Sequence, residues 1–143
     1  LLNFKNINLI QLPFNLFDNE YQRKEILVKA KKRNIEIHTR SVFLQGLFFK
    51  NINDKTPIVQ KLKSKLEILN QITIESNCSM EKLALSYCLH QKNIDNVIIG
   101  VDSISQLNGN IKASLYDIGQ DLIGVINNIK VKDLDLLNPS LWR

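Results

Sequence analysis

Three short stretches of the chain, residues 7–13, 35–39 and 96–100, are rich in apolar and β-branched residues and predict strands. Residues 7–13 are almost uncharged, as expected for a strand that is buried on both faces of a parallel sheet, and Pro13 ends the run. Residues 96–100, Asn-Val-Ile-Ile-Gly, form the most strand-like run of the chain. We therefore expect three strands.

Between and after these stretches, apolar residues recur every three or four positions, which is the spacing of one helix face. The first helix is expected to start at an N-cap, Asp18, and to end by Arg33. Pro57 suits the first turn of the second helix, because its missing N–H would have no helical partner there, and Ser79 suits the N-cap of the third. The helical patterns cover residues 18–33, 57–72, 79–88, a segment that begins near 103, and residues 115–129.

Strands and helices alternate along the chain, and this order indicates right-handed strand–helix–strand units around a parallel sheet. An apolar loop that contains Gly46 follows the second strand, at residues 41–49. Three strands are few for a parallel sheet, which normally needs both faces covered, and the chain begins at Leu1, almost inside the first strand. The sequence therefore predicts an α/β unit that is a piece of a larger architecture.

Residues 1–143 fit a single folding unit, with 44% hydrophobic and 23% charged positions. This composition excludes collagen-like, disordered and disulfide-rich proteins. The two cysteines, Cys78 and Cys88, stand ten positions apart, and this spacing fits no metal or redox motif. We therefore expect no metal site and a reducing compartment, with both cysteines packed in or near the helix pair.

Lysine and arginine outnumber aspartate and glutamate by 19 to 14, a formal net charge of +5. Lysine, isoleucine and asparagine are all abundant, as AT-rich coding would also produce, so the charge is weak support for a nucleic-acid partner. The densest basic cluster, residues 29–33, closes a helical pattern, where cations interact favourably with the helix dipole. Neither a membrane span nor a signal segment is visible, so we expect a cytoplasmic protein with no membrane or nucleic-acid partner.

Three motifs stand in the order and spacing of a known family. Residues 10–15 read Ile-Gln-Leu-Pro-Phe-Asn, and residues 40–48 read Arg-Ser-Val-Phe-Leu-Gln-Gly-Leu-Phe. Gly100 is followed by Gln106 and then by Asn110, at intervals of six and four residues. With these motifs, nearly the whole chain resembles the C-terminal part of an aldo/keto reductase.

The resemblance implies a (β/α)8 TIM barrel, of which this chain would supply strands six to eight with their helices. It also implies an NADP-dependent oxidoreductase that reduces an aldehyde or ketone by hydride transfer, with this chain as the cofactor-binding part. Barrels of this kind place their sites at the carboxyl ends of the strands, and the three motifs fall at those ends.

The first two motifs supply Gln11, Arg40, Ser41, Phe43 and Gly46 as cofactor-binding residues by this resemblance. Gln11 is expected to meet the nicotinamide carboxamide, and a bond to a neighbouring backbone group is the alternative, because a buried amide needs a partner. Ser41 and Gly46 would meet the pyrophosphate in the loop that also contains Phe43. Arg40 replaces an aromatic residue that commonly stacks on nicotinamide; its guanidinium could stack likewise, or meet a phosphate or an acidic substrate.

The third motif supplies Gly100, Asp102, Gln106 and Asn110 for the adenosine end. N–H groups at the start of the helix near Ser103 suit an anion. Gln106 and Asn110 share one helical face and by resemblance contact ribose and adenine, with a solvated polar face as the alternative. Asp102 would repel a 2′-phosphate and could bind ribose hydroxyls, so NAD is possible beside NADP.

The catalytic residues of the family, a proton-donating Tyr with Asp, Lys and His around it, belong to the first half of the barrel. Tyr21, Tyr87 and Tyr116 lie in helical patterns, and His38 and His90 have no partner at motif spacing, so we assign none of them to catalysis. The expected partners are a small carbonyl substrate and the missing N-terminal part of the barrel. The alternative is a non-catalytic truncated half-barrel or a partner-dependent fragment.

Overall fold

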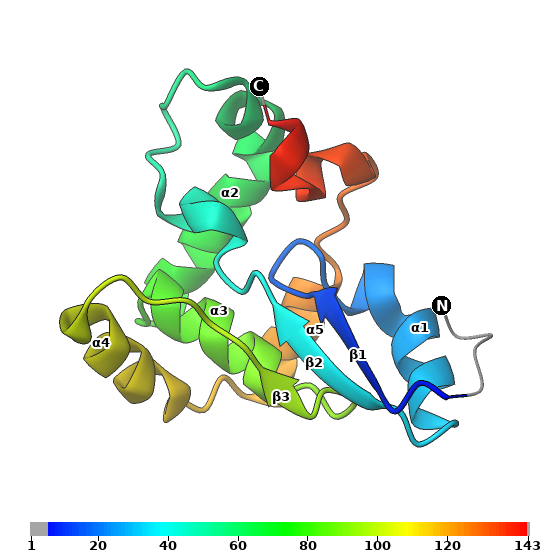
Figure 1. Cartoon of the computed structure of the whole chain (residues 1–143). Coiled ribbons are helices and arrows are strands. Elements are labelled where there is room, and N and C mark those ends of the chain that lie inside the picture. Colours follow the sequence, from blue (N-terminus) through cyan, green and yellow to red (C-terminus); the bar gives the residue numbers. More distant parts are fainter. Residues whose placement is uncertain (1–5, 143) are drawn as a thin grey trace.

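The computed structural model describes residues 6–142 of the chain (Figure 1). In this range the strands are β1 (Leu9–Pro13), β2 (Glu36–Arg40) and β3 (Asn96–Val97). The α-helices are α1 (Glu20–Lys31), α2 (Pro57–Glu75), α3 (Met80–Leu89), α4 (Ile104–Ser114) and α5 (Gln120–Asn127). Short 3-10 helices are η1 (Leu44–Phe49), η2 (Leu134–Leu137) and η3 (Pro139–Leu141).

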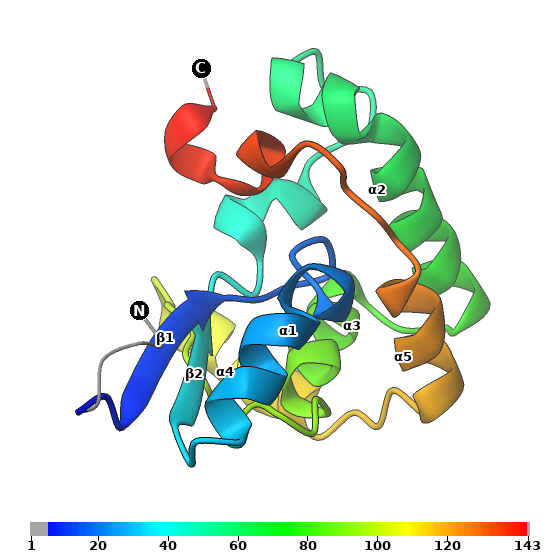
Figure 2. The same cartoon turned by 90° about the vertical axis from the view of Figure 1, so that its right-hand side faces the viewer.

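The strands form one parallel sheet in the order β1-β2-β3. Gln11 of β1 stands opposite His38 of β2, which in turn stands opposite Asn96 of β3. The predicted alternation of parallel strands and helices is therefore confirmed. The 3-10 helices lie beyond the carboxyl ends of β1 and β2, where loop residues and the chain's C-terminal segment meet (Figures 1 and 2).

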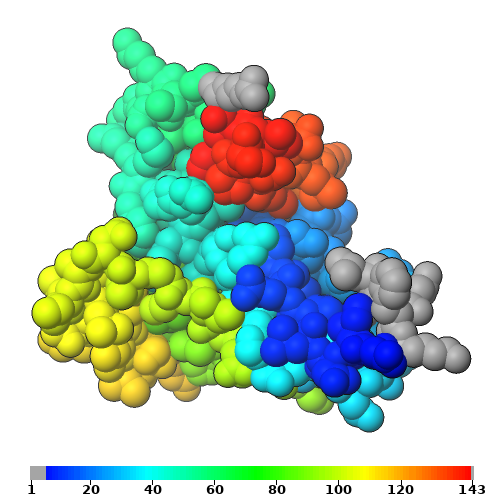
Figure 3. Space-filling view, in the orientation of Figure 1, coloured from blue at the N-terminus to red at the C-terminus, as the bar shows by residue number. Residues whose placement is uncertain are grey.

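Helices cover the sheet on one face only. Alternate strand residues such as Leu12, Ile37 and Thr39 are buried, and α1 and α3 lie on that side of the sheet, with α5 next to them (Figure 2). On the other face Leu9 and Gln11 are exposed, and atoms of β1 and β2 form part of the surface (Figure 3). The expectation that the first strand is buried on both faces is therefore wrong, because no segment of residues 6–142 packs on the second face.

The predicted N-cap Ser79 is confirmed, and the predicted N-cap Asp18 is wrong. The Oγ atoms of Ser79 and Ser103 accept backbone N–H groups at the starts of α3 and α4. At the start of α1 the cap is Asn19 instead of Asp18. The Asn19 amide also donates to two backbone carbonyls at and just after the end of α5, at 3.0 and 2.9 Å, which a carboxylate cannot do.

Two predicted elements are shorter than expected. β3 covers two residues of the predicted run 96–100, and the N–H of Ile98 adds one more bond to β2. The outer edge of β3 has no neighbouring strand in the described part of the chain, so nothing extends the pairing. The helical pattern at 115–129 yields α5 only from Gln120, because Gly119 has a positive φ of 71° and interrupts the helix.

The core lies between the sheet and the helices, with Phe14, Phe17 and Tyr87 among its largest fully buried side chains. Cys78 and Cys88 are both free and buried, as predicted, and burial raises the pKa of the Cys88 thiol. None of the helices within residues 6–142 combines the length and the apolar character needed to cross a lipid bilayer.

Candidate functional site

A groove of about 670 Å³ lies between η1, the start of α3 and one side of α4. Its lining brings together five of the nine predicted cofactor-binding residues, from segments up to about sixty residues apart. These residues are Phe43, Gly46, Asp102, Gln106 and Asn110.

A smaller pocket of about 270 Å³ adjoins this groove. It is lined by residues 41–46 on one side and by residues 98–100 on the other, so it adds Ser41 and Gly100. Phe43 and Gly46 line both hollows, so the two hollows are neighbours. Seven of the nine predicted residues therefore share one surface near the carboxyl ends of β2 and β3.

The loop after β2 has an unusual backbone. Ser41, Leu44, Gln45 and Gly46 all have a positive φ, at 64°, 44°, 54° and 77°. Glycine adopts this conformation without cost, whereas the other three residues are strained and need their surroundings to hold them. The side-chain amide of Asn15 helps by donating to the Ser41 carbonyl at 3.2 Å. Strained backbone of this kind clusters at ligand-binding sites, which marks this loop as a functional candidate.

The segment from Gly100 to Asn110 is organised by its own side chains. Gln106 Oε1 accepts the N–H of Asp102 at 2.8 Å, and the Gln106 N–H binds the N-cap Ser103 at 3.1 Å. Gln106 therefore shapes the turn into α4 as well as lining the groove. Asn110 is only 7% exposed, and its side chain makes no hydrogen bond with any residue between 6 and 142, so its amide is available to a ligand.

Arg40 lies outside the groove. Its guanidinium donates to Ser41 Oγ at 3.1 Å, and the side chain lines a separate pocket at the ends of β1 and β2. Asp18 and Arg23 line the same pocket and form an ion pair. Burial raises the pKa of the Asp18 carboxyl, and the hydrogen bonds and positive charge of Arg23 oppose this shift without cancelling it.

Gln11 differs most from the prediction. It was expected to be a buried amide inside an apolar strand, but it is exposed on the open face of the sheet. It is not among the residues that line the groove or the adjoining pocket. The argument that burial forces its amide to find a partner therefore does not apply to this chain.

Two basic residues line the groove that the sequence motifs do not predict. Lys82 comes from α3 and Lys112 from α4, and both line the groove beside Asp102. The Nζ atom of Lys82 also lies 5.7 Å from the centre of the Tyr116 ring. In the sequence both lysines occupy ordinary polar positions of amphipathic helices, so no local signal distinguishes them. Glu81 of α3 lines the groove as well, so the two lysines share it with two carboxylates, and only a phosphate bound next to the ammonium groups would gain from their charge.

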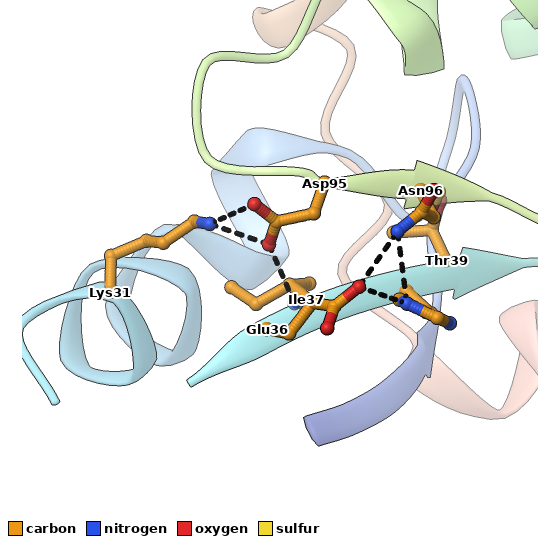
Figure 4. Close-up of polar contacts among 7 residues, drawn as sticks. Lys31, Glu36, Ile37, Thr39, Asp95 and Asn96 are labelled. Carbon is orange, nitrogen blue, oxygen red and sulfur yellow. Dashed lines mark hydrogen bonds and ion pairs between the residues drawn. The ribbon is translucent and has the colours of Figure 1, made fainter. Parts of the chain in front are cut away.

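A polar cluster occupies the open face of the sheet (Figure 4). Glu36 Oε1 lies 2.7 Å from His38 Nε2 and accepts the side-chain amide of Asn96 at 2.9 Å. His38 is half-buried, as predicted, but the expectation that it lacks a carboxylate partner is wrong. The two residues share a face because strand side chains two positions apart point the same way.

The tyrosines give no catalytic arrangement. Tyr87 is fully buried and donates to Asn127, and burial raises the pKa of its phenol. Tyr21 is exposed on α1, and Tyr116 lies between α4 and α5. Among the residues that the structure describes, no three His, Cys, Asp or Glu side chains form a group that could hold a metal ion.

Comparison with known proteins identifies the relatives of this chain. The model of the aldo/keto reductase family matches residues 3–130. Among solved structures, the apo form of aldo-keto reductase AKR11C1 from Bacillus halodurans matches with a TM-score of 0.74 at 19% identity. The match covers 90% of this chain and 45% of that protein.

The glycerol dehydrogenase AKR11B4 from Gluconobacter oxydans matches with a TM-score of 0.65, also at 19% identity. In that case 92% of this chain and 43% of the other are covered. At such identities the structural matches show the fold alone. The chain spans less than half the length of the solved structures that it matches.

Proposed function

The chain belongs to the aldo/keto reductase family, and from this premise we propose that it is the cofactor-binding part of an NAD(P)-dependent carbonyl reductase. In this proposal it forms the C-terminal portion of a (β/α)8 barrel, strands six to eight. The observation that carries it is the groove with its adjoining pocket, because together they are lined by seven of the nine residues assigned by resemblance to the cofactor.

The groove would hold the adenosine end of the dinucleotide. Asn110 offers a free amide to adenine, and Gln106 lies one helical turn before it on the same face of α4. Ser41, Phe43, Gly46 and Gly100 line the adjoining pocket, which would take the pyrophosphate. Arg40 and Gln11 lie at or near the ends of β2 and β1, where we assign the nicotinamide end.

The choice between NADP and NAD depends on opposing charges. Lys82 and Lys112 favour a 2′-phosphate, whereas the carboxylate of Asp102 would repel it and could accept ribose hydroxyls. Glu81 also lines the groove, so two cations stand against two carboxylates and the lining has no net charge. We propose NADP as the principal cofactor, in line with the usual preference of the family, with NAD as the second.

Hydride transfer also needs a proton donor and the rest of the barrel. The described part of this chain offers no tyrosine in a suitable position. We therefore propose that the catalytic residues come from the N-terminal part of the barrel. The substrate would be a small aldehyde or ketone bound where the two parts meet.

The test is to titrate the full chain with NADPH and with NADH and to measure both dissociation constants by calorimetry. Asn110→Ala should weaken binding of both cofactors by about 3–10-fold, since one hydrogen bond contributes about 0.5–1.5 kcal/mol. Asn108→Ala is the matched control, because Asn108 is exposed on the same helix and does not line the groove. Equal affinities for the two variants would remove the adenosine assignment.

The same titration tests the charge argument at Asp102. Asp102→Ala should raise the affinity for NADPH relative to NADH, because the variant no longer repels the 2′-phosphate. An unchanged ratio of the two dissociation constants would show that Asp102 does not face the 2′ position.

A further inference from the structure

A second cavity, of about 320 Å³, lies at the carboxyl ends of β1 and β2 and is separate from the groove. Its walls come from three parts of the chain: the two strand ends, the first turn of α1 and the C-terminal segment around η2 and η3. Its size is at the lower end of the range for small-molecule sites. Ser41 lines this cavity and also the pocket assigned to the pyrophosphate, so the two sites are neighbours.

The cavity holds one cation, Arg40, that forms no ion pair with residues 6–142, although its positive charge also acts on the Asp18 carboxyl. Arg23 donates two hydrogen bonds to the Asp18 carboxylate, at 2.6 and 2.5 Å, so these two residues neutralise each other. Arg40 lines the cavity as well, and no carboxylate of residues 6–142 lies within ion-pair distance of its guanidinium. The net charge of these three side chains is therefore +1.

The polar groups left over are mostly hydrogen-bond donors. Arg40 uses one N–H on Ser41 Oγ and keeps the others. The Oδ1 atom of Asn138 accepts from Ser140, which leaves its amide N–H groups without a partner among the described residues. The side-chain amide of Gln22, by contrast, is already bonded to a backbone carbonyl at 2.6 Å. A planar guanidinium with an amide donor beside it suits the oxygens of a carboxylate or a phosphate.

From this arrangement we infer that the cavity binds an anionic group of the carbonyl substrate, with Arg40 as its cation and Asn138 as a second donor. The inference rests on the proposed function, because it places this group beside the nicotinamide end. The substrate class then narrows to small aldehydes or ketones that also carry a carboxylate or a phosphate. Neutral carbonyl compounds would leave Arg40 without a counter-charge.

The test is an NMR titration of the ¹⁵N-labelled full chain with pyruvate, inorganic phosphate and hydroxyacetone, a neutral ketone of similar size. Pyruvate or phosphate should shift the signals of the Arg40 Nε–H and the Asn138 side-chain amide, and hydroxyacetone should not. Arg40→Gln should weaken anion binding at least tenfold. Arg40→Lys should restore part of the affinity, since lysine keeps the positive charge but lacks the forked pair of N–H donors of a guanidinium. The tighter of the two anions identifies the group.

Lys24→Gln is the control, because it also removes one positive charge, but from an exposed position of α1 that does not line the cavity. Equal anion affinity in wild type and Arg40→Gln, or equal shifts with hydroxyacetone, would overturn the inference. NADPH is titrated into the same samples, and its binding is measured from the amide signals of Gly46 and Asn110. Loss of cofactor binding with intact anion binding would contradict the proposed function instead, so the two failures are distinguishable.

Discussion

The phenol of Tyr87 joins three helices. Tyr87 lies in α3, and its phenol oxygen donates to Asn127 of α5 and accepts the backbone N–H of Glu20 in α1 at 3.2 Å. Asn127 closes the network by donating to the Glu20 carboxylate at 2.7 Å. The ring stacks on Phe14 with 5.6 Å between centroids. A fully buried hydroxyl that both donates and accepts a hydrogen bond fixes the relative positions of these helices.

Tyr87→Phe should therefore lower the free energy of unfolding by about 1–3 kcal/mol, because it keeps the ring stack and removes the hydrogen-bond partner of two half-buried groups, the Glu20 N–H and the Asn127 side-chain oxygen. Thermal unfolding followed by circular dichroism measures the change. Tyr21→Phe is the control, since Tyr21 is 52% exposed and the variant keeps the ring that Lys130 contacts. Equal melting temperatures for the two variants would show that the Tyr87 hydroxyl contributes nothing to stability.

Among the structural elements, β3 is attached to β2 and α1 partly through one carboxylate, that of Asp95 (Figure 4). Asp95, directly before β3, accepts the N–H of Ile37 in β2 at 2.7 Å and forms an ion pair with Lys31 of α1. The Lys31 ammonium and, next, the Ile37 N–H hold the pKa of Asp95 below its ordinary value of 3.8. A lowered pKa means that the charged form stabilises the fold above that value, and this contribution disappears as the pH falls through the folded-state pKa.

Asp95→Ala should destabilise the protein by about 1–3 kcal/mol at pH 7, mainly because the buried N–H of Ile37 loses its acceptor, while the screened ion pair adds little. The difference from wild type should shrink as the pH is lowered from 5 to about 2. Glu25→Ala is the matched control, because Glu25 pairs with Lys29 on an exposed helix surface. Melting curves across this pH range check both points, and a difference that does not change with pH would contradict the role of the Asp95 charge.

For the whole molecule, the main feature is the open face of the sheet, on which no segment of residues 6–142 packs. The solved relatives carry more than half of their chain outside the matched part. In the described part of this chain the outer edges of β1 and β3 are unpaired, and Leu9 is 44% exposed on the open face. Unpaired strand edges and apolar strand residues favour association with another chain.

We expect the chain by itself to self-associate in a concentration-dependent way, measured by sedimentation velocity. Leu9→Lys should weaken this association at least about tenfold, because it would bury a charge in the contact. Ile74→Lys is the control, since Ile74 is exposed on α2, away from the sheet. A chain that stays monomeric at every concentration would count against the proposal that this face is covered by the N-terminal part of the barrel.

The sequence by itself determined the order of strands and helices, the N-cap at Ser79, and the family. These features depend on local spacing: apolar periodicity, a hydroxyl three residues before the N–H that it caps, and short motifs. The residues proposed for the adenosine end could be selected for the same reason, because Gly100, Gln106 and Asn110 lie within eleven positions of one another; their role stays a prediction.

Only the tertiary structure decided the rest. Asn19 replaces Asp18 as a cap because its amide meets carbonyls more than a hundred residues away. Lys82 joins the groove because α3 packs beside α4, and Gln11 is exposed because nothing in the described chain covers its face of the sheet. Each outcome depends on segments far apart in the sequence, which no local pattern encodes.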